Sequence, residues 1–551
     1  MAPFSPARQG QEGGMIGEER RYREDKPGGR VMRNRIQGAR MARALLFGIL
    51  LACIGCTPSH SSGESGLYDQ SWLETGLSTW EVAPPAQTPH PVLTLLPATP
   101  QPGVTRAEPT PDAIRQPPTL RTTTEVYYVQ LGDTINDLAF EYGVAPSQIV
   151  AASGLRNPSY LYVGQRLIIP PPEPQPPGPT FKIVPDSELV YGPATALFDV
   201  RTVMEDWGQA LARYTQPVEG RTLDGLAIVE MVAERYSVNP RLLLALLEYQ
   251  GGWLMHDRIP DGMRNYPLGF SSSGTEGLYA QLSWAADQLN RGYYLWRAGW
   301  SGPYIFVDGV VIIPGPGINA GTAGVQYLLS QLYPSVEWRH AVGEQGFYQT
   351  LVETFGDPFE RAVEPLVPPD LQQPVLQLPF EEGEVWAYTG GPHSAWGKYA
   401  AWGALDFAPT GYVMGCVQTE AWVVAAADGK ILISEEGQVI QDLDGDGYEG
   451  TGWVLLYMHI ESRDRVPAGA VLRAGDRIGH ASCEGGISSG SHVHLARKYN
   501  GEWISADGSL PFNLDGWVSS GWGVAYDGYL SRGTVRLEAC ACRYPGNQIS
   551  R

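Results

Sequence analysis

Two proline-rich stretches interrupt this chain, and they limit it to a series of separate folded segments. Residues 57–124 contain PPAQTPHP, LLPATPQPG and AEPTPD and show no sustained hydrophobic period, which predicts a disordered, partly extended tether. A shorter linker, residues 171–187, begins with PPEPQPPGPT. Because 551 residues also exceed what one hydrophobic core can organise, we expect a multidomain protein.

The first 56 residues have the pattern of an export signal. Residues 1–43 hold ten basic and five acidic side chains, and the apolar run over 44–52 is nine residues long. A membrane span needs about 20 residues, so this run indicates a signal sequence. The run ends in LLAC, which resembles the lipobox of bacterial lipoproteins and marks Cys53 as the acylated residue. We expect a cell-envelope protein that is lipid-anchored on the outer face of the cytoplasmic membrane. Two alternatives stay open: Cys56 is the lipidated residue, or the protein is secreted without a lipid.

The charge and the cysteine content restrict which partners and which disulfide bonds this protein can have. The formal net charge is −20 although the N-terminal segment is basic, and so acidic a body would be repelled by nucleic acid, which excludes DNA and RNA as partners. Export favours disulfides, and the four cysteines beyond the signal allow three pairings. We favour Cys416 with Cys483, because Cys540 and Cys542 lie together near the C-terminus.

Residues 125–170 predict a small module of strand, helix, helix and strand. A strand starts at the Tyr-Val pair before QLGD, Thr134 or the preceding aspartate can cap the first helix, and Gly143 ends it. The ordered segments YVQLGDTINDLAFEYGV, NPSYL and GQRLIIP resemble the LysM domain. This resemblance implies a βααβ fold that binds glycans containing N-acetylglucosamine, such as peptidoglycan. The glycan-contacting residues are not identified by the pattern.

Residues 188–370 have helical periodicity and predict a mainly-α domain. The run RLLLALL over 241–247 resembles the helix that carries the catalytic glutamate of goose-type lytic transglycosylases, which continues into Gln-Glu-Ser-Gly. Here Gln250 replaces the acid, and an amide cannot protonate a glycosidic oxygen. Glu248 lies about 200° away around the helix and cannot substitute. We therefore expect a lysozyme-like domain that is inactive as a glycosidase and serves as a glycan-binding or spacer segment.

Residues 371–551 consist of short β-rich runs separated by turn signals, which predicts an all-β antiparallel domain. Five of the nine histidines fall here. In Ser-His-Val-His, strand alternation places His492 and His494 on one face. Two imidazoles on one face of a strand suit a metal or acid–base site.

The segments GGPH, ALDF, YMH and GSHVH, in this order, resemble the lysostaphin-type zinc endopeptidases of bacterial cell walls. Most members place a histidine four residues before the aspartate, where this chain has Trp402. In the β-lytic branch of the family, the histidine lies 13 residues before the aspartate, within a Gly-Gly-x-His sequence. In this chain His393 lies 13 residues before Asp406, within such a sequence. The resemblance therefore assigns His393, Asp406 and His494 as ligands of Zn²⁺, with a fourth position left open for water.

The same resemblance gives roles to two further histidines. His492 and His459 would act as general base and as stabiliser of the tetrahedral oxyanion, in an order that the sequence does not decide. His480 matches no catalytic segment and is expected to be structural.

An acidic loop forms a second candidate metal site. Asp442, Asp444 and Asp446 match the first positions of an EF-hand-like loop, but Trp453 stands where the bidentate glutamate is required. The loop predicts either a structural Ca²⁺ site or an acidic turn.

These features predict an exported, peptidoglycan-binding zinc metalloendopeptidase that hydrolyses peptide cross-links of the cell wall. The alternative is a non-catalytic cell-wall scaffold or activator with degenerate enzyme domains. Cleavage of glycan by the middle domain is a third hypothesis, which Gln250 argues against.

Overall fold

The computed structural model describes residues 115, 120–173, 175–207, 209–259, 262–272, 274–300 and 302–551. The chain divides into two units, residues 1–63 and 64–551, and all described residues belong to the second. The predicted signal, Cys53 and most of the tether therefore lie outside the described residues. Among the residues that are described, no helix has the length and apolar character needed to cross a membrane.

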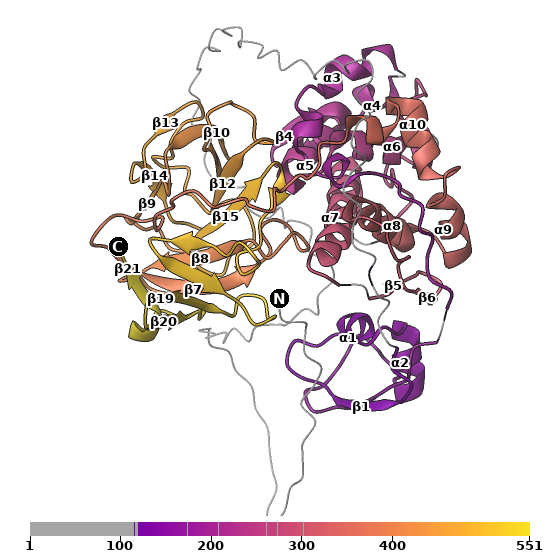
Figure 1. Ribbon diagram of the computed structural model, residues 1–551, viewed down its shortest axis with the longest axis horizontal. Helices are drawn as coiled ribbons and strands as arrows, with labels where there is room; N and C mark the ends of the chain where they lie inside the picture. The colour runs from indigo at the N-terminus through magenta and orange to yellow at the C-terminus, as the bar shows by residue number, and fades with distance from the viewer. Residues whose placement is uncertain are drawn as a thin grey trace, which may run out of the picture. The chain divides into compact units, whose positions relative to one another are not determined.

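The segment that begins at residue 125 folds as a βααβ module (Figure 1). Strand β1 (Glu125–Tyr128) pairs antiparallel with β2 (Arg166–Ile169), and α1 (Ile135–Tyr142) and α2 (Pro146–Ser153) connect them. The Thr134 side chain caps α1 by accepting a hydrogen bond from the Asp137 N–H, and Gly143 ends α1 with φ 64°. The order of elements is the one expected from the sequence.

The middle segment is mainly helical, as predicted. Its helices are α3 (Val200–Val203), α4 (Ala210–Arg213), α5 (Gly225–Tyr236), α6 (Pro240–Gly251), α7 (Leu278–Arg297), α8 (Ala320–Leu332), α9 (Ser335–Ala341) and α10 (Phe347–Phe355). Two short hairpins join them, β3 (Thr215–Val218) with β4 (Arg221–Asp224) and β5 (Tyr304–Ile305) with β6 (Val311–Ile312).

Helices α7 and α8 pack closely because glycine stands at their contact. A Cβ atom added at Gly292 would lie 2.5 Å from the carbonyl oxygen of Ala323, and one added at Gly324 would lie 2.8 Å from that of Leu289. Larger side chains at these two positions would force the helices apart.

The C-terminal segment contains a nine-stranded antiparallel sheet (orange to yellow in Figure 1). The strands along its main path are, in spatial order, β13 (Val471–Leu472), β10 (Gly429–Glu435), β11 (Gln438–Asp442), β12 (Trp453–Met458), β15 (Val493–Tyr499), β8 (Ala404–Pro409), β7 (Val385–His393) and β21 (Gln548–Ser550). Strand β16 (Glu502–Trp503) pairs with β15.

Two smaller sheets complete the segment. Strands β9 (Trp422–Val424) and β14 (Arg477–His480) form a pair. A four-stranded meander consists of β17 (Asn513–Leu514), β18 (Trp517–Ser520), β19 (Tyr529–Arg532) and β20 (Val535–Glu538). The mostly-β C-terminal segment is thus as expected from the sequence.

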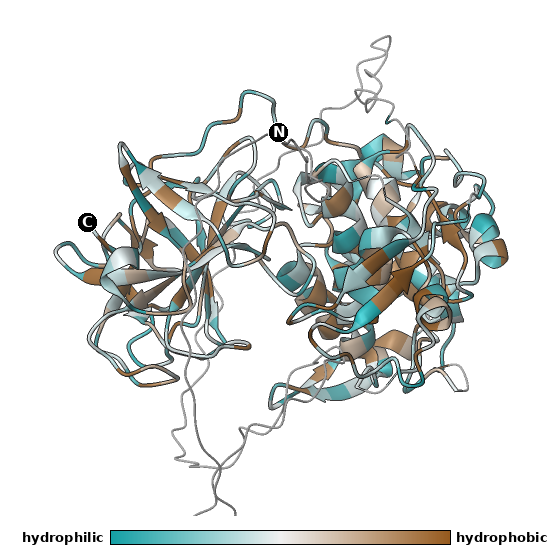
Figure 2. Ribbon diagram, turned by 90° about the horizontal axis from the view of Figure 1, so that it is seen from below, coloured by the Kyte–Doolittle hydropathy of each residue, from teal (hydrophilic) through white to brown (hydrophobic). Residues whose placement is uncertain are grey.

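The nine-stranded sheet is buried on both faces. On β12, Leu455 and Tyr457 belong to the core of the β segment, whereas Leu456 and Met458 belong to a core shared with the helices. Figure 2 shows hydrophobic residues on both the strands and the helices. Because each face has a cover, β12 is a continuous apolar run and not an alternating one. The middle segment and the sheet therefore share one hydrophobic core.

Candidate metal centre

Three neighbouring strands bring the predicted ligand residues together. His393 ends β7, Asp406 lies on β8 and His494 lies on β15. In the sheet register His494 is directly opposite Asp406, and an irregularity in β7 between Gly390 and His393 turns the histidine toward the same place. One ligand atom from each of the three residues lies within 4.8 Å of the others.

Backbone carbonyl groups fix the two imidazoles of this cluster. Nδ1–H of His393 donates to the carbonyl of Gly391 at 2.8 Å, which leaves Nε2 unprotonated. Nε2–H of His494 donates to the carbonyl of Ala395 at 3.1 Å, which leaves Nδ1 unprotonated. The two free nitrogens lie 2.9 Å apart. Carbonyl partners of this kind orient imidazoles for metal binding.

The carboxylate of Asp406 lies among these nitrogens. Its Oδ1 atom is buried and has no well-formed hydrogen bond. Nε2 of His393 and Nδ1 of His494 each lie 3.3 Å from it. Burial alone would raise the pKa of Asp406, but the positive charge that His393 and His492 carry when protonated holds it well below its ordinary value. With those imidazoles neutral, the buried carboxylate oxygen and the two ring nitrogens fit the donor set of a divalent metal such as zinc.

His459 and His492 complete the group. Their ring centroids lie 4.4 Å apart, and Nε2 of His492 is 3.7 Å from Oδ1 of Asp406. Nδ1–H of His459 donates to the Glu484 carbonyl at 2.9 Å, and Nδ1–H of His492 donates to the Gly490 carbonyl at 2.7 Å. Burial, and then the neighbouring imidazoles, lower the pKa of His459 to about 3, so this ring is neutral at neutral pH. Each histidine keeps Nε2 free to exchange a proton.

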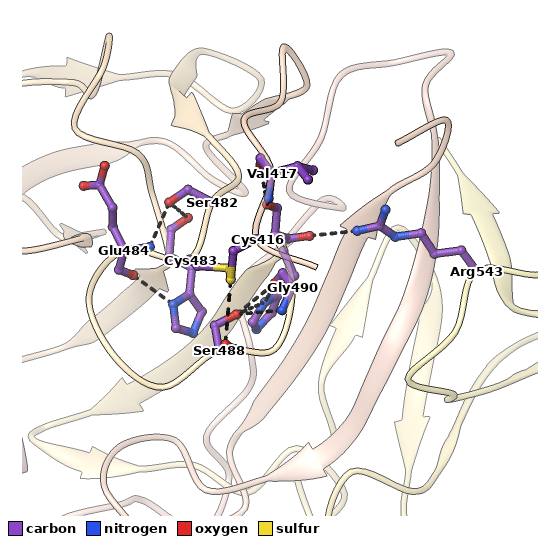
Figure 3. Close-up of a disulfide and its surroundings, with 11 residues drawn as sticks. Cys416, Val417, Ser482, Cys483, Glu484, Ser488, Gly490 and Arg543 are labelled. Atoms are coloured by element: carbon purple, nitrogen blue, oxygen red, sulfur yellow. Dashed lines mark hydrogen bonds between the residues drawn. A yellow bond between two sulfur atoms is a disulfide. The ribbon is translucent and has the colours of Figure 1, made fainter. Parts of the chain in front are cut away.

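A disulfide connects the two loops beside these histidines. Cys416 is bonded to Cys483, the favoured pairing, and Cys540 is bonded to Cys542. Figure 3 shows Glu484 and Gly490 close to the Cys416–Cys483 bridge. The bridge ties the loop after β8 to the segment that supplies both carbonyl partners, so it restrains the positions of the histidine rings.

The other sequence-predicted positions lie outside the cluster. The rings of His480 and Trp422 are tilted by 41° with centroids 3.9 Å apart, and Nε2 of His480 is 3.6 Å from Oδ2 of Asp464. Trp402 contributes its carbonyl, which accepts a hydrogen bond from Ala506 N–H at 2.7 Å.

Sequence reasoning missed Tyr526. Its ring is stacked on that of His393 with centroids 4.2 Å apart and an interplanar angle of 20°. Its carbonyl accepts a hydrogen bond from Gly391 N–H at 2.7 Å, and its own N–H donates to the Pro392 carbonyl at 3.1 Å. No local motif marks this tyrosine, since its contacts come from a loop more than 130 residues away. It belongs to the packing around His393, the first of the predicted ligands.

In the middle segment, the residues weighed as acids have other partners. Oε1 of Gln250 accepts a hydrogen bond from the Tyr333 hydroxyl at 3.1 Å. Oε2 of Glu248 accepts hydrogen bonds from the N–H groups of Leu254 at 2.8 Å and Met255 at 3.2 Å. Glu248 thus closes the turn after α6.

The acidic loop folds on its own backbone. Ligand atoms of Asp442, Asp444 and Asp446 lie within 4.8 Å of one another. Asp442 accepts hydrogen bonds from the N–H groups of Asp444 and Gly445 at 3.1 Å each. These internal bonds form the turn without requiring an ion.

Comparison with known proteins matches two parts of the described chain to protein families. Residues 127–170 match the LysM domain family, and residues 182–369 match the family described as LasA, N-terminal domain. Protease LasA of Pseudomonas aeruginosa is 28% identical over 299 residues, which cover 50% of this chain and 66% of the relative, just under two thirds. The beta-lytic metalloendopeptidase of Lysobacter enzymogenes is 29% identical over 161 residues, covering 29% of this chain and 86% of the relative.

Two solved structures with local similarity are described as peptidases. The M23 metalloprotease pseudoalterin from the deep sea is 26% identical, with a TM-score of 0.26, and covers 30% of this chain and 96% of its own. The catalytic domain of lysostaphin from Staphylococcus simulans is 23% identical, with a TM-score of 0.16, and covers 22% of this chain and 87% of its own.

The matched relatives are named as a protease and a metalloendopeptidase, and residues 127–170 of this chain match the LysM domain. These similarities agree with the resemblance to lysostaphin-type peptidases seen in the sequence of this chain. The match of the middle segment is to the LasA N-terminal domain, and its lysozyme-like fold stays a prediction.

Proposed function

We propose that this protein is an exported, peptidoglycan-binding zinc metalloendopeptidase that hydrolyses peptide cross-links in bacterial cell walls. The observation that carries the proposal is the Oδ1 atom of Asp406, which is buried without a well-formed hydrogen bond beside two unprotonated imidazole nitrogens. A cation at this point would satisfy all three atoms at once.

His393, Asp406 and His494 would hold the zinc ion, which when bound supplies a Lewis acid for the scissile carbonyl and activates water at neutral pH. His492 and His459 do the proton chemistry. Each has a free Nε2 and an Nδ1–H that is held by a carbonyl. One histidine takes the proton of the attacking water and the other stabilises the tetrahedral oxyanion.

The LysM domain would supply the second half of the function. Its match to a glycan-binding family supports attachment to peptidoglycan strands. A weak glycan binder joined to a peptidase raises the local concentration of peptide cross-links without a new contact at the catalytic site. Acylation at Cys53 and export belong to the same proposal and rest on the sequence pattern alone.

The middle segment, in this proposal, is a lysozyme-like domain without glycosidase activity. The amide of Gln250 and the engagement of Glu248 with two backbone N–H groups leave no free acid at the end of α6. A structural Ca²⁺ at Asp442, Asp444 and Asp446 remains a separate prediction, testable by calcium content.

The decisive experiment measures metal and products together. The full chain and its His393→Ala variant are analysed by elemental mass spectrometry and incubated with purified peptidoglycan. We expect about one zinc per chain, new peptide amino termini, and loss of both in the variant. New reducing sugar ends would point to glycan cleavage, and absence of zinc and of products would favour the scaffold.

A further inference from the structure

Arg543 connects two loops beside the candidate metal centre to the C-terminal turn. Its Nη1 group donates hydrogen bonds to the carbonyl oxygens of Tyr412 at 3.0 Å and Val413 at 3.2 Å, in the loop after β8. Its Nη2 group donates to the carbonyl of Ser491 at 3.1 Å, in the loop that leads into β15. Figure 3 shows the Arg543 side chain extending toward these two loops beside the disulfide. One guanidinium thus holds three carbonyl groups of two separate loops.

The charge of Arg543 is not matched by an acidic side chain. Burial lowers the pKa of this partly buried guanidinium, and no carboxylate of the described residues raises it. Its Nε–H is buried without a hydrogen-bond partner within the part of the chain that the structure describes. An arginine stays protonated even so, and a partly buried charge with only carbonyl partners costs free energy. Stability alone therefore does not favour arginine here, whereas a rigid fork of donors that reaches several acceptors at once does.

The carbonyl that accepts from Nη2 belongs to the residue directly before His492. The N–H of Ser491 donates to the Gly415 carbonyl at 3.1 Å, and its hydroxyl oxygen accepts from the Val417 N–H at 2.9 Å. Every polar group of Ser491 is therefore engaged, either by the loop after β8 or by the guanidinium. The residue before it, Gly490, supplies the carbonyl that holds Nδ1–H of His492 at 2.7 Å. The backbone that orients this imidazole is thus fixed at Ser491.

The turn that carries Arg543 has its own anchors. The Asn547 side chain is fully buried, and its amide nitrogen donates to the carbonyl of Tyr388 on β7 at 3.0 Å. The same nitrogen donates to the carbonyls of Cys540 at 3.3 Å and Cys542 at 2.9 Å. The bond between these two cysteines closes the turn directly before Arg543. The arginine therefore extends from a fixed base and can hold the loops in place.

We propose that Arg543 is a positioning residue for His492. The guanidinium fixes the loop after β8 against the backbone of Ser491, and this backbone sets the direction of the imidazole. The proposal rests on the proposed function, in which His492 takes part in the proton chemistry. Arg543 acts only through Ser491, so zinc binding does not require it.

The first measurement is amide hydrogen exchange of the full chain and its Arg543→Gln variant. Glutamine removes the charge and the fork and can satisfy at most part of the carbonyl groups. We expect exchange in residues 412–418 and 486–493 to become faster by roughly tenfold or more, because these amides lose a charged hydrogen-bond anchor. Exchange in the other strands of the sheet should not change.

Arg551→Gln is the matched control. Arg551 lies in the same C-terminal segment and also donates to a backbone carbonyl, that of Phe380, at 3.3 Å. The strand before it pairs with the first residues of β7, whereas His393 is the last residue of β7. This variant should leave both the exchange of the two loops and the cleavage rate unchanged.

Cleavage of soluble peptidoglycan fragments separates positioning from a merely structural role. Arg543→Gln should lower kcat by roughly 10- to 100-fold and leave KM and zinc content unchanged. Arg543→Lys keeps the charge without the fork and should give an intermediate rate. Arg543→Ala should regain activity when ethylguanidinium, which replaces the removed atoms, is added. Ethylammonium has the charge but not the fork and should not restore the rate.

Three results would overturn the proposal: unchanged exchange in Arg543→Gln, faster exchange with an unchanged kcat, or equal effects of Arg551→Gln. Equal recovery of Arg543→Ala with ethylammonium would also overturn it, because charge alone would then suffice. A wild-type chain that cleaves no peptide would overturn the proposed function and this proposal with it. An active wild type with any of the other results overturns the role of Arg543 alone.

Discussion

Oδ1 of Asp287, on helix α7, accepts a hydrogen bond from the backbone N–H of Tyr399 at 3.0 Å across 112 residues of sequence. The same oxygen accepts a second bond from Lys398 N–H, also at 3.0 Å. Both donors lie in the loop that leaves β7 after His393. The carbonyl of Ala395 in this loop orients His494. A helix of the middle segment therefore supports the loop that borders the candidate metal centre.

The free energy of unfolding should depend on pH because the pKa of Asp287 is raised in the folded chain. Burial raises its pKa to about 6 in the folded chain, against 3.8 ordinarily, and the two backbone N–H groups only partly oppose this. Between about pH 4 and 6 the folded state therefore holds a proton that the unfolded state has lost, and stability falls as pH rises through this window. Asp287→Asn removes the effect, so its stability relative to wild type should rise by up to about 3 kcal/mol over that window.

Denaturant unfolding at pH 4, 5, 6 and 7 measures this difference. Asp308→Asn is the control, because backbone and hydroxyl hydrogen bonds from Ser335 outweigh desolvation and lower the pKa of Asp308. A lowered carboxyl pKa places the change in stability below about pH 4, so the Asp308 variant should run nearly parallel to wild type between pH 4 and 7. Parallel curves for wild type and Asp287→Asn would contradict the assignment.

The disulfide between Cys416 and Cys483 should matter for the histidine pair more than for metal binding. Replacing both cysteines by serine frees the segment whose Glu484 and Gly490 carbonyls hold His459 and His492. We expect zinc content to stay unchanged and the cleavage rate to fall by about 10²-fold, the cost of slight misplacement of reacting groups.

The same double variant should lower the free energy of unfolding by up to about 4 kcal/mol, because the bridge closes a loop with a sequence separation of 67. Cys540 and Cys542, only 2 positions apart, provide the matched control, since their bridge closes almost no chain. Loss of zinc from the Cys416 and Cys483 variant would show that the bridge supports the ligands as well.

Tyr526 should support His393 through its ring and not through its hydroxyl. Tyr526→Phe keeps the stacked ring and should leave zinc affinity unchanged. Tyr526→Ala removes the stack, and supporting groups around a ligand are typically worth roughly 10- to 100-fold in affinity. Competition with a chelator measures both variants. An equal loss in the phenylalanine and alanine variants would assign the effect to the hydroxyl.

The sequence was informative where chemistry depends on short spacings. The distance of His393 from Asp406 and the alternation of His492 with His494 are local, and the sheet register brings these residues together. Contacts between residues far apart in the sequence could not be predicted from it. Examples are those of Asp287 with Tyr399, of Tyr526 with His393, and of β12 with the helices. The apolar run WVLLYM belongs to the predicted β-rich runs, but no pattern within it identified the helices that cover one face of this strand.

The ion pair of Arg297 with Glu502 tests whether the helices and the sheet unfold together. Glu502 is buried, accepts a hydrogen bond from Arg297 Nε at 2.9 Å, and accepts another from the Tyr293 hydroxyl at 2.9 Å. Glu502→Ala leaves both partners unpaired at the shared core. Because the Arg297 side chain is 39% exposed, we expect a loss of about 2 kcal/mol and not the full cost of a buried pair.

The exposed pair of Arg221 with Glu435 joins the same two segments and is the matched control. Their side chains are 42% and 47% exposed, so Glu435→Ala should change stability by less than about 1 kcal/mol. Urea unfolding followed by both tryptophan fluorescence and circular dichroism should give coincident transitions in wild type, since one core spans both segments. Separate transitions in wild type, or equal effects of the two substitutions, would contradict a shared core held in place by Glu502.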